Sequence, residues 1–381
     1  MSACVLCAQA DNSALAQKAV EAERSGDFKT AIAAFEQLIR NGADSPELRS
    51  NLGIAYYQTG AFDKALREFH SVLEREPESV SGNFFTGLSL LKLERPKAAI
   101  PYLDKAHKLH AQDPAPALAL AQAEVECNNM ERAQALYLEA TRIDPQNAEA
   151  WYGLGIADRA LAEPVAKRSL QGATAGTAQH TPAANARALM DASEQAITRA
   201  MQLNPNALQA HMLMGESFRI AERYDDAIRE YRAATEQAPD LAAAWAGLAA
   251  AYSAAANDNE ALKAAKRALQ LDTHDPQIDS IIAGTLLRQG DYADAEPYAK
   301  KALQEQPSLA SAHLVLAKIY LSRSERSKAL PELETAAKDD TDGNVYYLLA
   351  TTLRELGKTG EAAAALQKYK TLHAAHVAAM R

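Results

Sequence analysis

The 381-residue sequence contains only three cysteines and no long apolar run. Cys4, Cys7 and Cys127 are too few to form a disulfide framework. No stretch of 18 or more apolar residues occurs, so the sequence predicts no membrane-spanning segment. A basic excess is also missing, because 40 lysines and arginines stand against 49 aspartates and glutamates, for a formal net charge of −9. We therefore expect no nucleic-acid partner, since nothing offsets the charge of a phosphate backbone.

Catalytic and metal-binding motifs are absent as well. There is no nucleophile elbow, Walker loop, dinucleotide fingerprint or zinc quartet. Cys4 and Cys7 form a C-x-x-C without a second pair. Two histidine pairs have a helical spacing of three, His107 with His110 and His373 with His376. Neither pair has the carboxylate or cysteine neighbours that a four-ligand metal site needs, so we expect surface histidines. The sequence predicts no catalytic residue, no cofactor and no metal, and hence a protein that is not an enzyme.

One unit of 34 residues recurs along almost the whole sequence. Its clearest copy, from Pro46 to Pro77, has two runs of apolar residues at spacings of three and four, separated by Gly60. Such spacing predicts two amphipathic helices, because 3.6 residues per turn return side chains to one stripe. The small residue of the second helix recurs at Ala31, Ala65, Ala99, Ala133, Ser193, Ala227, Ala261, Ala295, Ala329 and Ala362. Prolines that close the unit recur at Pro77, Pro145, Pro205, Pro239 and Pro307.

This pattern resembles the tetratricopeptide repeat family, whose 34-residue helix-turn-helix unit has small and large residues at these places. Two copies match the family's opening motif, with Trp151, Leu154 and Gly155, and with Trp245, Leu248 and Ala249. The resemblance covers about residues 12 to 375. It implies an all-α fold, a right-handed α-solenoid of about ten repeats in which each hairpin buries its apolar face against its neighbours.

The repeats suggest where the chain divides. We expect repeats 1 to 4 and the first helix of repeat 5 over residues 12–163, and an inserted loop over residues 164–181, which are rich in Pro, Gly, Ala and Thr. The second helix of repeat 5, repeats 6 to 10 and a capping helix follow over residues 182–381. The insertion is either a tolerated loop or a flap over a binding groove.

Residues 1–11 allow two interpretations. Ala8-Gln9-Ala10 has the small-x-small form of a secretory cleavage site, although no lysine or arginine precedes it. The segment is then the tail of a truncated signal peptide, and the protein is periplasmic or secreted. Alternatively it is a frayed N-terminus, and the protein is cytoplasmic.

The candidate site is a stripe on the first helices, formed by positions 5, 9 and 12 of each repeat, which the family resemblance places on the concave side. In repeats 2 to 5 most of the stripe is apolar or aromatic, whereas in repeats 6 to 8 it is mostly small or polar. An exposed apolar strip usually marks a binding surface. The predicted partner-binding residues are Ile54, Tyr57, Phe84, Leu88, Leu91, Leu118, Tyr152 and Ile156. The alternative is that neighbouring repeats cover this stripe as core.

These features predict a non-catalytic scaffold or adaptor that binds a peptide or helix of a partner protein in the concave groove. Two other functions fit the same repeats. One is a periplasmic adaptor for envelope assembly or secretion, and the other is a regulatory subunit of a separately encoded enzyme. The sequence specifies neither the partner nor the oligomeric state.

Overall fold

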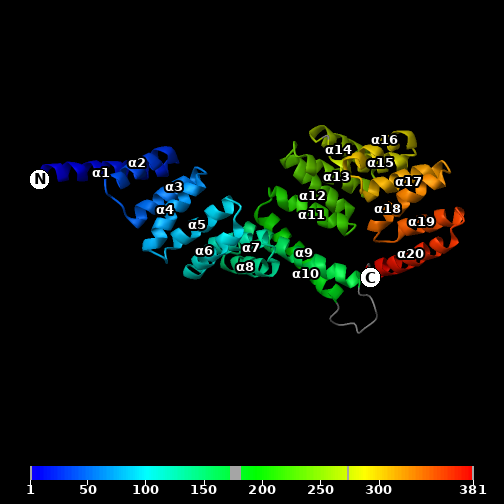
Figure 1. Ribbon diagram of the computed structural model, residues 1–381, viewed down its shortest axis with the longest axis horizontal. Coiled ribbons are helices and arrows are strands. Elements are labelled where there is room, and N and C mark those ends of the chain that lie inside the picture. Colours follow the sequence, from blue (N-terminus) through cyan, green and yellow to red (C-terminus); the bar gives the residue numbers. More distant parts are fainter. Residues whose placement is uncertain (1, 172–181, 273, 380–381) are drawn as a thin grey trace. The chain divides into compact units, whose positions relative to one another are not determined.

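The computed structural model describes residues 2–171, 182–272 and 274–379 (Figure 1). Over these residues the fold is entirely helical, with twenty α-helices, one short 3-10 helix and no strand. The predicted all-α array of ten helical hairpins is confirmed. None of the helices in the described ranges has both the length and the apolar character needed to cross a membrane.

The helices follow one another in ten pairs, each pair being one repeat. In unit order they are α1 (Ser2–Arg24) and α2 (Phe28–Arg40), α3 (Pro46–Gln58) and α4 (Phe62–Arg75), α5 (Val80–Lys92) and α6 (Pro96–Leu109), α7 (Pro114–Glu126) and α8 (Met130–Ile143), α9 (Ala148–Gln171) and α10 (Pro182–Leu203), α11 (Leu208–Ile220) and α12 (Tyr224–Gln237), α13 (Ala242–Ala254) and α14 (Asp258–Leu271), α15 (Pro276–Gln289) and α16 (Tyr292–Glu305), α17 (Ala310–Ser322) and α18 (Arg326–Ala336), and α19 (Asn344–Glu355) and α20 (Thr359–Ala379). The 3-10 helix, Ala337–Asp339, follows α18.

The chain forms two compact units. Unit 1 consists of Met1–Ala166 and His180–Leu203, and unit 2 consists of Lys167–Gln179 and Asn204–Arg381. Unit 1 therefore holds the stripe of repeats 2 to 5, and unit 2 holds the stripe of repeats 6 to 8.

Most hairpins turn through one residue in the left-handed conformation. Gly60, where the sequence predicts the break between helices, has φ +76°, and its amide donates to the Tyr57 carbonyl at 3.0 Å. The equivalent turn residue is glycine at Gly26, Gly290 and Gly357, and a larger residue at Glu94, Asn128, Glu222, Ala256 and Ser324. A β-carbon makes this conformation costly, by about 1 kcal/mol, so the turn is set by the packing of the two helices as well as by its own sequence.

The closing prolines are tied to the helix that follows them. The side chain six residues after each proline lies within hydrogen-bonding distance of the proline carbonyl. The five pairs are Asn83 with Pro77 (3.0 Å), Trp151 with Pro145 (3.0 Å), His211 with Pro205 (3.0 Å), Trp245 with Pro239 (2.9 Å) and His313 with Pro307 (2.9 Å). Indole, imidazole and amide all supply an N–H for a carbonyl at the end of a helix, where no backbone donor is left. The same position of the repeat thus holds asparagine, tryptophan or histidine, and each can donate an N–H to the proline carbonyl.

The structure differs from the sequence expectation in two places. Helix α9 continues through Gln171, past residue 164, where we expected the inserted loop to begin. Five of the eight residues from 164 to 171 are good helix formers (one each of alanine, lysine, arginine, leucine and glutamine), and the helix continues despite Pro164. The rest of the predicted loop, residues 172–181, lies outside the described residues. Helix α1 likewise begins at Ser2, earlier than the predicted start at residue 12. The signal-peptide interpretation stays a prediction.

Candidate partner-binding site

The predicted partner-binding residues all lie on first helices of unit 1. Ile54 and Tyr57 are on α3, Phe84, Leu88 and Leu91 on α5, Leu118 on α7, and Tyr152 and Ile156 on α9. Six of them are half-buried, while Leu91 and Leu118 are buried. Those two side chains belong to the hydrophobic core, so a partner could not contact them in this conformation. None of the eight is fully exposed.

Neighbouring repeats cover much of the stripe. The first helices of successive repeats contact one another, α3 with α5 and α5 with α7. The ring of Tyr57 lies edge-on to Phe85 of the next repeat, with 5.6 Å between the ring centroids. The hydroxyl oxygens of Ser50 and Ser81 are 3.3 Å apart across the same seam. The alternative that the stripe serves as inter-repeat core therefore holds for part of each side chain, and a partner would meet the remainder.

The accessible part of the stripe carries two tyrosine hydroxyls. Burial raises the pKa of both Tyr57 and Tyr152, so both phenols are neutral near pH 7. Among the described residues neither hydroxyl has a hydrogen-bond partner within the chain. Each is therefore available as a donor to a carbonyl brought by a ligand. Between them on α7, Gln122 is exposed and donates from Nε2 to Glu126 at 3.1 Å.

The corresponding stripe of unit 2 is closed by polar contacts. Arg219 forms an ion pair with Glu216 at 2.7 Å, and the Tyr231 hydroxyl donates to Glu216 at 3.2 Å. The hydrogen bond to Glu216 raises the pKa of Arg219. Further along, the hydroxyl oxygens of Ser253 and Thr285 lie 3.5 Å apart. These groups satisfy one another and leave little apolar surface for a partner.

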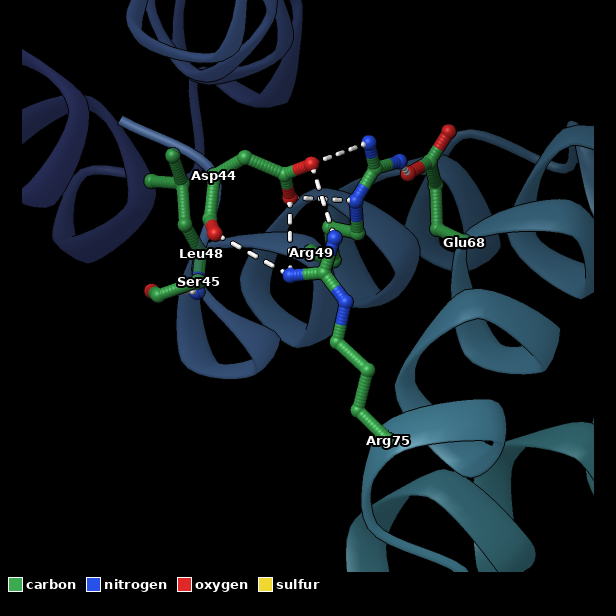
Figure 2. A network of polar contacts seen from close by, with 6 residues as sticks. All are labelled: Asp44, Ser45, Leu48, Arg49, Glu68 and Arg75. Carbon is green, nitrogen blue, oxygen red and sulfur yellow. Dashed lines mark hydrogen bonds and ion pairs between the residues drawn. The ribbon is translucent and has the colours of Figure 1, made fainter. Parts of the chain in front are cut away.

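A network of charges fixes the start of the stripe (Figure 2). Asp44 precedes α3 and accepts from two arginines, with Arg49 Nε at 2.6 Å and Arg75 at 3.0 Å. Arg49 also donates to Glu68 on α4 at 2.7 Å. The two guanidinium groups hold the pKa of Asp44 at about 2.

Ser45 completes this arrangement by accepting the Leu48 amide at 3.2 Å as the N-cap of α3. The network ties the end of repeat 1 to both helices of repeat 2, so it sets the entry angle of the first stripe helix. Sequence reasoning missed it. The only signal was an Asp-Ser-Pro start followed by basic residues.

The predicted histidine pairs do not converge on a shared ligand, and His110 lies just past the end of α6. His107 Nε2 is 3.4 Å from Glu139, and His110 is 3.6 Å from Asp113. The His373 ring stacks on Tyr369 at 5.3 Å. Over the described ranges, no three histidines, cysteines or carboxylates are grouped so that they could hold a metal ion.

Family comparisons match these helical hairpins directly. Models described as "Tetratricopeptide repeat" cover residues 17–69, 51–114 and 183–242, residues 90–157, 218–284 and 286–351, and residues 343–375. Together they span well over half of the sequence. The chain belongs to the tetratricopeptide repeat family. The hairpins of both units are therefore tetratricopeptide repeats, as the sequence pattern indicated.

Known relatives share only part of their length with this tetratricopeptide repeat protein. "Superkiller protein 3" of Schizosaccharomyces pombe is 28% identical over 233 residues, which cover 54% of this chain and 16% of that protein. "RNA polymerase-associated protein CTR9" of Caenorhabditis elegans is 31% identical over 145 residues, covering 36% and 13%. Among solved structures, "Crystal structure of APC/C hetero-tetramer Cut9-Hcn1" is similar with a TM-score of 0.47 and 16% identity, covering 95% of this chain and 72% of that one. The chain thus spans less than one fifth of these two curated relatives.

Proposed function

We propose that this protein is a non-catalytic scaffold whose first helices in repeats 2 to 5 hold an amphipathic helix or an extended peptide of a partner protein. One observation carries the proposal. Six half-buried apolar or aromatic side chains lie on one series of first helices, and two of them, Tyr57 and Tyr152, have hydroxyls without a partner in the described chain. A peptide can cover the exposed apolar edges and supply carbonyls to the two phenols, which is how side-chain pockets and main-chain bonds combine in peptide recognition.

Family membership supports the same function. In a stack of hairpins each repeat is stabilised by contacts with its neighbours, and the stack presents an extended helical surface. Such a surface suits the binding of another protein. The relatives named above include a protein described as associated with RNA polymerase, and the similar crystal structure is that of a hetero-tetramer.

A charge placed in the stripe without disturbing the core tests the proposal. Gln122 is exposed at the centre of the stripe on α7, so Gln122→Lys adds a cation there and changes stability by no more than about 0.5 kcal/mol. Ala135 is exposed on the second helix α8, and Ala135→Lys is the matched control. Both new lysines lie four residues from a glutamate of their own helix, which keeps their helical environments alike.

The partner is recovered by affinity capture with the wild-type chain, and its Kd is then measured by calorimetry against each variant. We expect Gln122→Lys to weaken binding by about tenfold or more, because an apolar ligand edge would desolvate the new charge. Ala135→Lys leaves the Kd unchanged. Equal affinity of the wild type and Gln122→Lys would refute the stripe as the binding surface.

A further inference from the structure

One position of the second helices carries a side chain that is buried in nearly every repeat. It lies four residues after the small residue of that helix. In repeat 2 it is Phe69, whose ring stacks on Phe85 of repeat 3 with 5.6 Å between centroids. In repeats 4 and 6 a tyrosine at this position presses so closely on the next first helix that only glycine fits opposite. A β-carbon on Gly153 or Gly247 would lie 2.2 Å from a carbon of that ring.

The tenth repeat is the exception. In the other nine repeats this residue is at most 9% exposed: Phe35, Phe69, Leu103, Tyr137, Ile197, Tyr231, Ala265, Ala299 and Leu333. In the tenth it is Leu366, which is 37% exposed. Beside it lies an open cavity of about 250 Å³ between α19 and α20, lined by Tyr347, Thr351, Arg354, Ala363 and Leu366 among others. Tyr347 is itself 52% exposed. In repeats 2, 4 and 6 the following first helix packs on this position. In repeat 10 no further helix of the described chain does so, and we call the surface formed by Tyr347, Thr351, Arg354, Ala363 and Leu366 the seat.

The shape of this seat suits a helix. Tyr347, Thr351 and Arg354 occupy the positions of α19 that face the next first helix in the interior of the array. Ser253, at the position of Arg354 in repeat 7, shows that relation, since its hydroxyl is 3.5 Å from Thr285 on the following first helix. An apolar helix laid across α19 and α20 would cover Leu366 in the way that α5 covers Phe69.

The positive charge of Arg354 beside the cavity further limits which kind of helix could bind there. Arg354 is exposed and has no hydrogen bond or ion pair among the described residues. Every other arginine described in unit 2 has a polar partner: Arg219, Arg223, Arg229, Arg232, Arg267, Arg288, Arg323 and Arg326. The nearby Lys358 is paired with Glu361 at 3.3 Å. The seat therefore offers an apolar floor with one uncompensated positive charge at its edge, which favours a ligand with a carboxylate at the matching place.

We propose that the face formed by α19 and α20 docks an amphipathic helix of a partner protein, seated like the first helix of a further repeat, with an acidic residue of that helix paired to Arg354. This surface is separate from the stripe on repeats 2 to 5, and the proposal does not depend on it.

A peptide from the chain itself provides the probe. The α15 sequence, residues 276–289, already packs on a preceding hairpin through α13 and α14. Its Thr285 faces the position that Arg354 occupies in repeat 10. We would compare two labelled, end-capped peptides of this sequence, one with Thr285→Glu and one with Thr285→Lys, for binding to the full-length chain by fluorescence anisotropy. The acidic peptide should bind about threefold to fivefold more tightly, as for an exposed ion pair.

Variants of the chain separate the seat from other surfaces. Arg354→Glu should reverse the preference between the two peptides. Ala363→Lys puts a charge in the cavity and should weaken both peptides by about tenfold, whereas Ala364→Lys, exposed on the same helix but outside the cavity lining, leaves both unchanged. The proposal fails if neither peptide binds saturably, or if Arg354→Glu leaves the preference as it was. It also fails if sedimentation shows the chain self-associating in a way that Ala363→Lys abolishes, because a second copy then covers this face.

Discussion

The seam between α3 and α5 in unit 1 is filled differently from the seam between α15 and α17 in unit 2. In unit 1 aromatic rings fill the seam, with Phe69 stacked on Phe85 and Tyr57 set edge-on to the same ring. At the α15–α17 seam of unit 2 the described residues form no ring pair, and the Ser280 and Ser311 hydroxyls meet at 2.7 Å. The backbone period is the same in both. Large rings fill a seam but leave apolar edges at its surface, whereas paired hydroxyls leave none. On this reasoning we expect the first-helix stripe to offer more apolar surface in repeats 2 to 5 than in repeats 6 to 8.

The strongest test of this contrast is Phe69→Ala. Phe69 is fully buried between two repeats, so its loss should destabilise unit 1 by about 3 to 5 kcal/mol. Urea unfolding would give the size of the loss, and hydrogen exchange would show it concentrated in α3 to α6. Tyr292→Ala is the control, because Tyr292 is an exposed aromatic of unit 2 and its loss should cost less than about 0.5 kcal/mol. Similar losses from both changes would mean that the ring does not close the seam.

A smaller effect is expected from Gly153→Ala. The new β-carbon would lie 2.2 Å from Cε1 of Tyr137, so one of the two helices has to move, at a cost of about 1 to 3 kcal/mol. Tyr137→Leu in the same chain should recover part of that loss by making room. Thermal unfolding of the single and double variants measures the coupling. If the two losses simply add, the ring and the glycine are not in contact.

A glycine of unit 2 that has open space beside it should respond with the opposite sign. Gly284 lies inside α15, and a β-carbon there would meet only Val315 Cγ2, at 3.9 Å. Gly284→Ala should therefore stabilise the chain by about 0.5 to 1 kcal/mol through helix propensity. The midpoint of urea unfolding checks this value. A destabilised variant would show that the side chains around Gly284 leave no room for a β-carbon.

The smallest effect concerns the exposed network of Figure 2, which has a weaker counterpart in unit 2. Asp44 contacts two arginines, whereas Asp240, at the same place in repeat 7, contacts only Arg267, at 3.2 Å. The pKa of Asp44, about 2, lies below the ordinary aspartate value of about 3.9. Its contribution to stability is therefore complete above about pH 4 and is lost as the pH falls toward 2.

Carboxyl NMR titration measures this directly. We expect a midpoint of about 2 for Asp44 and an upward shift in the Arg75→Gln variant. In Asp44→Asn the pH dependence of α3 hydrogen exchange between about pH 4 and 2 should flatten. A wild-type midpoint near 4 would show that the two guanidinium groups do not act on this carboxylate in solution.

Local patterns predicted the repeat and its small residues, but not how each large residue divides its surface between seam and solvent. Ala65 could be placed from spacing because a close helix–helix approach admits only small side chains. Leu91 and Leu118 looked equivalent to Leu88, yet both are buried in the hydrophobic core of unit 1. The donors that hold the proline carbonyls could have been found as a recurring N–H side chain six residues after each proline. The two-arginine contact of Asp44 could not, because Arg75 lies 31 residues away.

The sequence alone determined the helical hairpin, its 34-residue period and the family. The hairpin follows from apolar spacings of three and four within each helix, and the period and the family follow from the recurrence of that pattern along the chain. The tertiary structure decided which faces stay accessible, since within each unit a hairpin is covered by neighbours whose fit depends on side chains about a full repeat away. For that reason the half-buried stripe of unit 1 and the uncovered Leu366 emerged only when the hairpins were packed together.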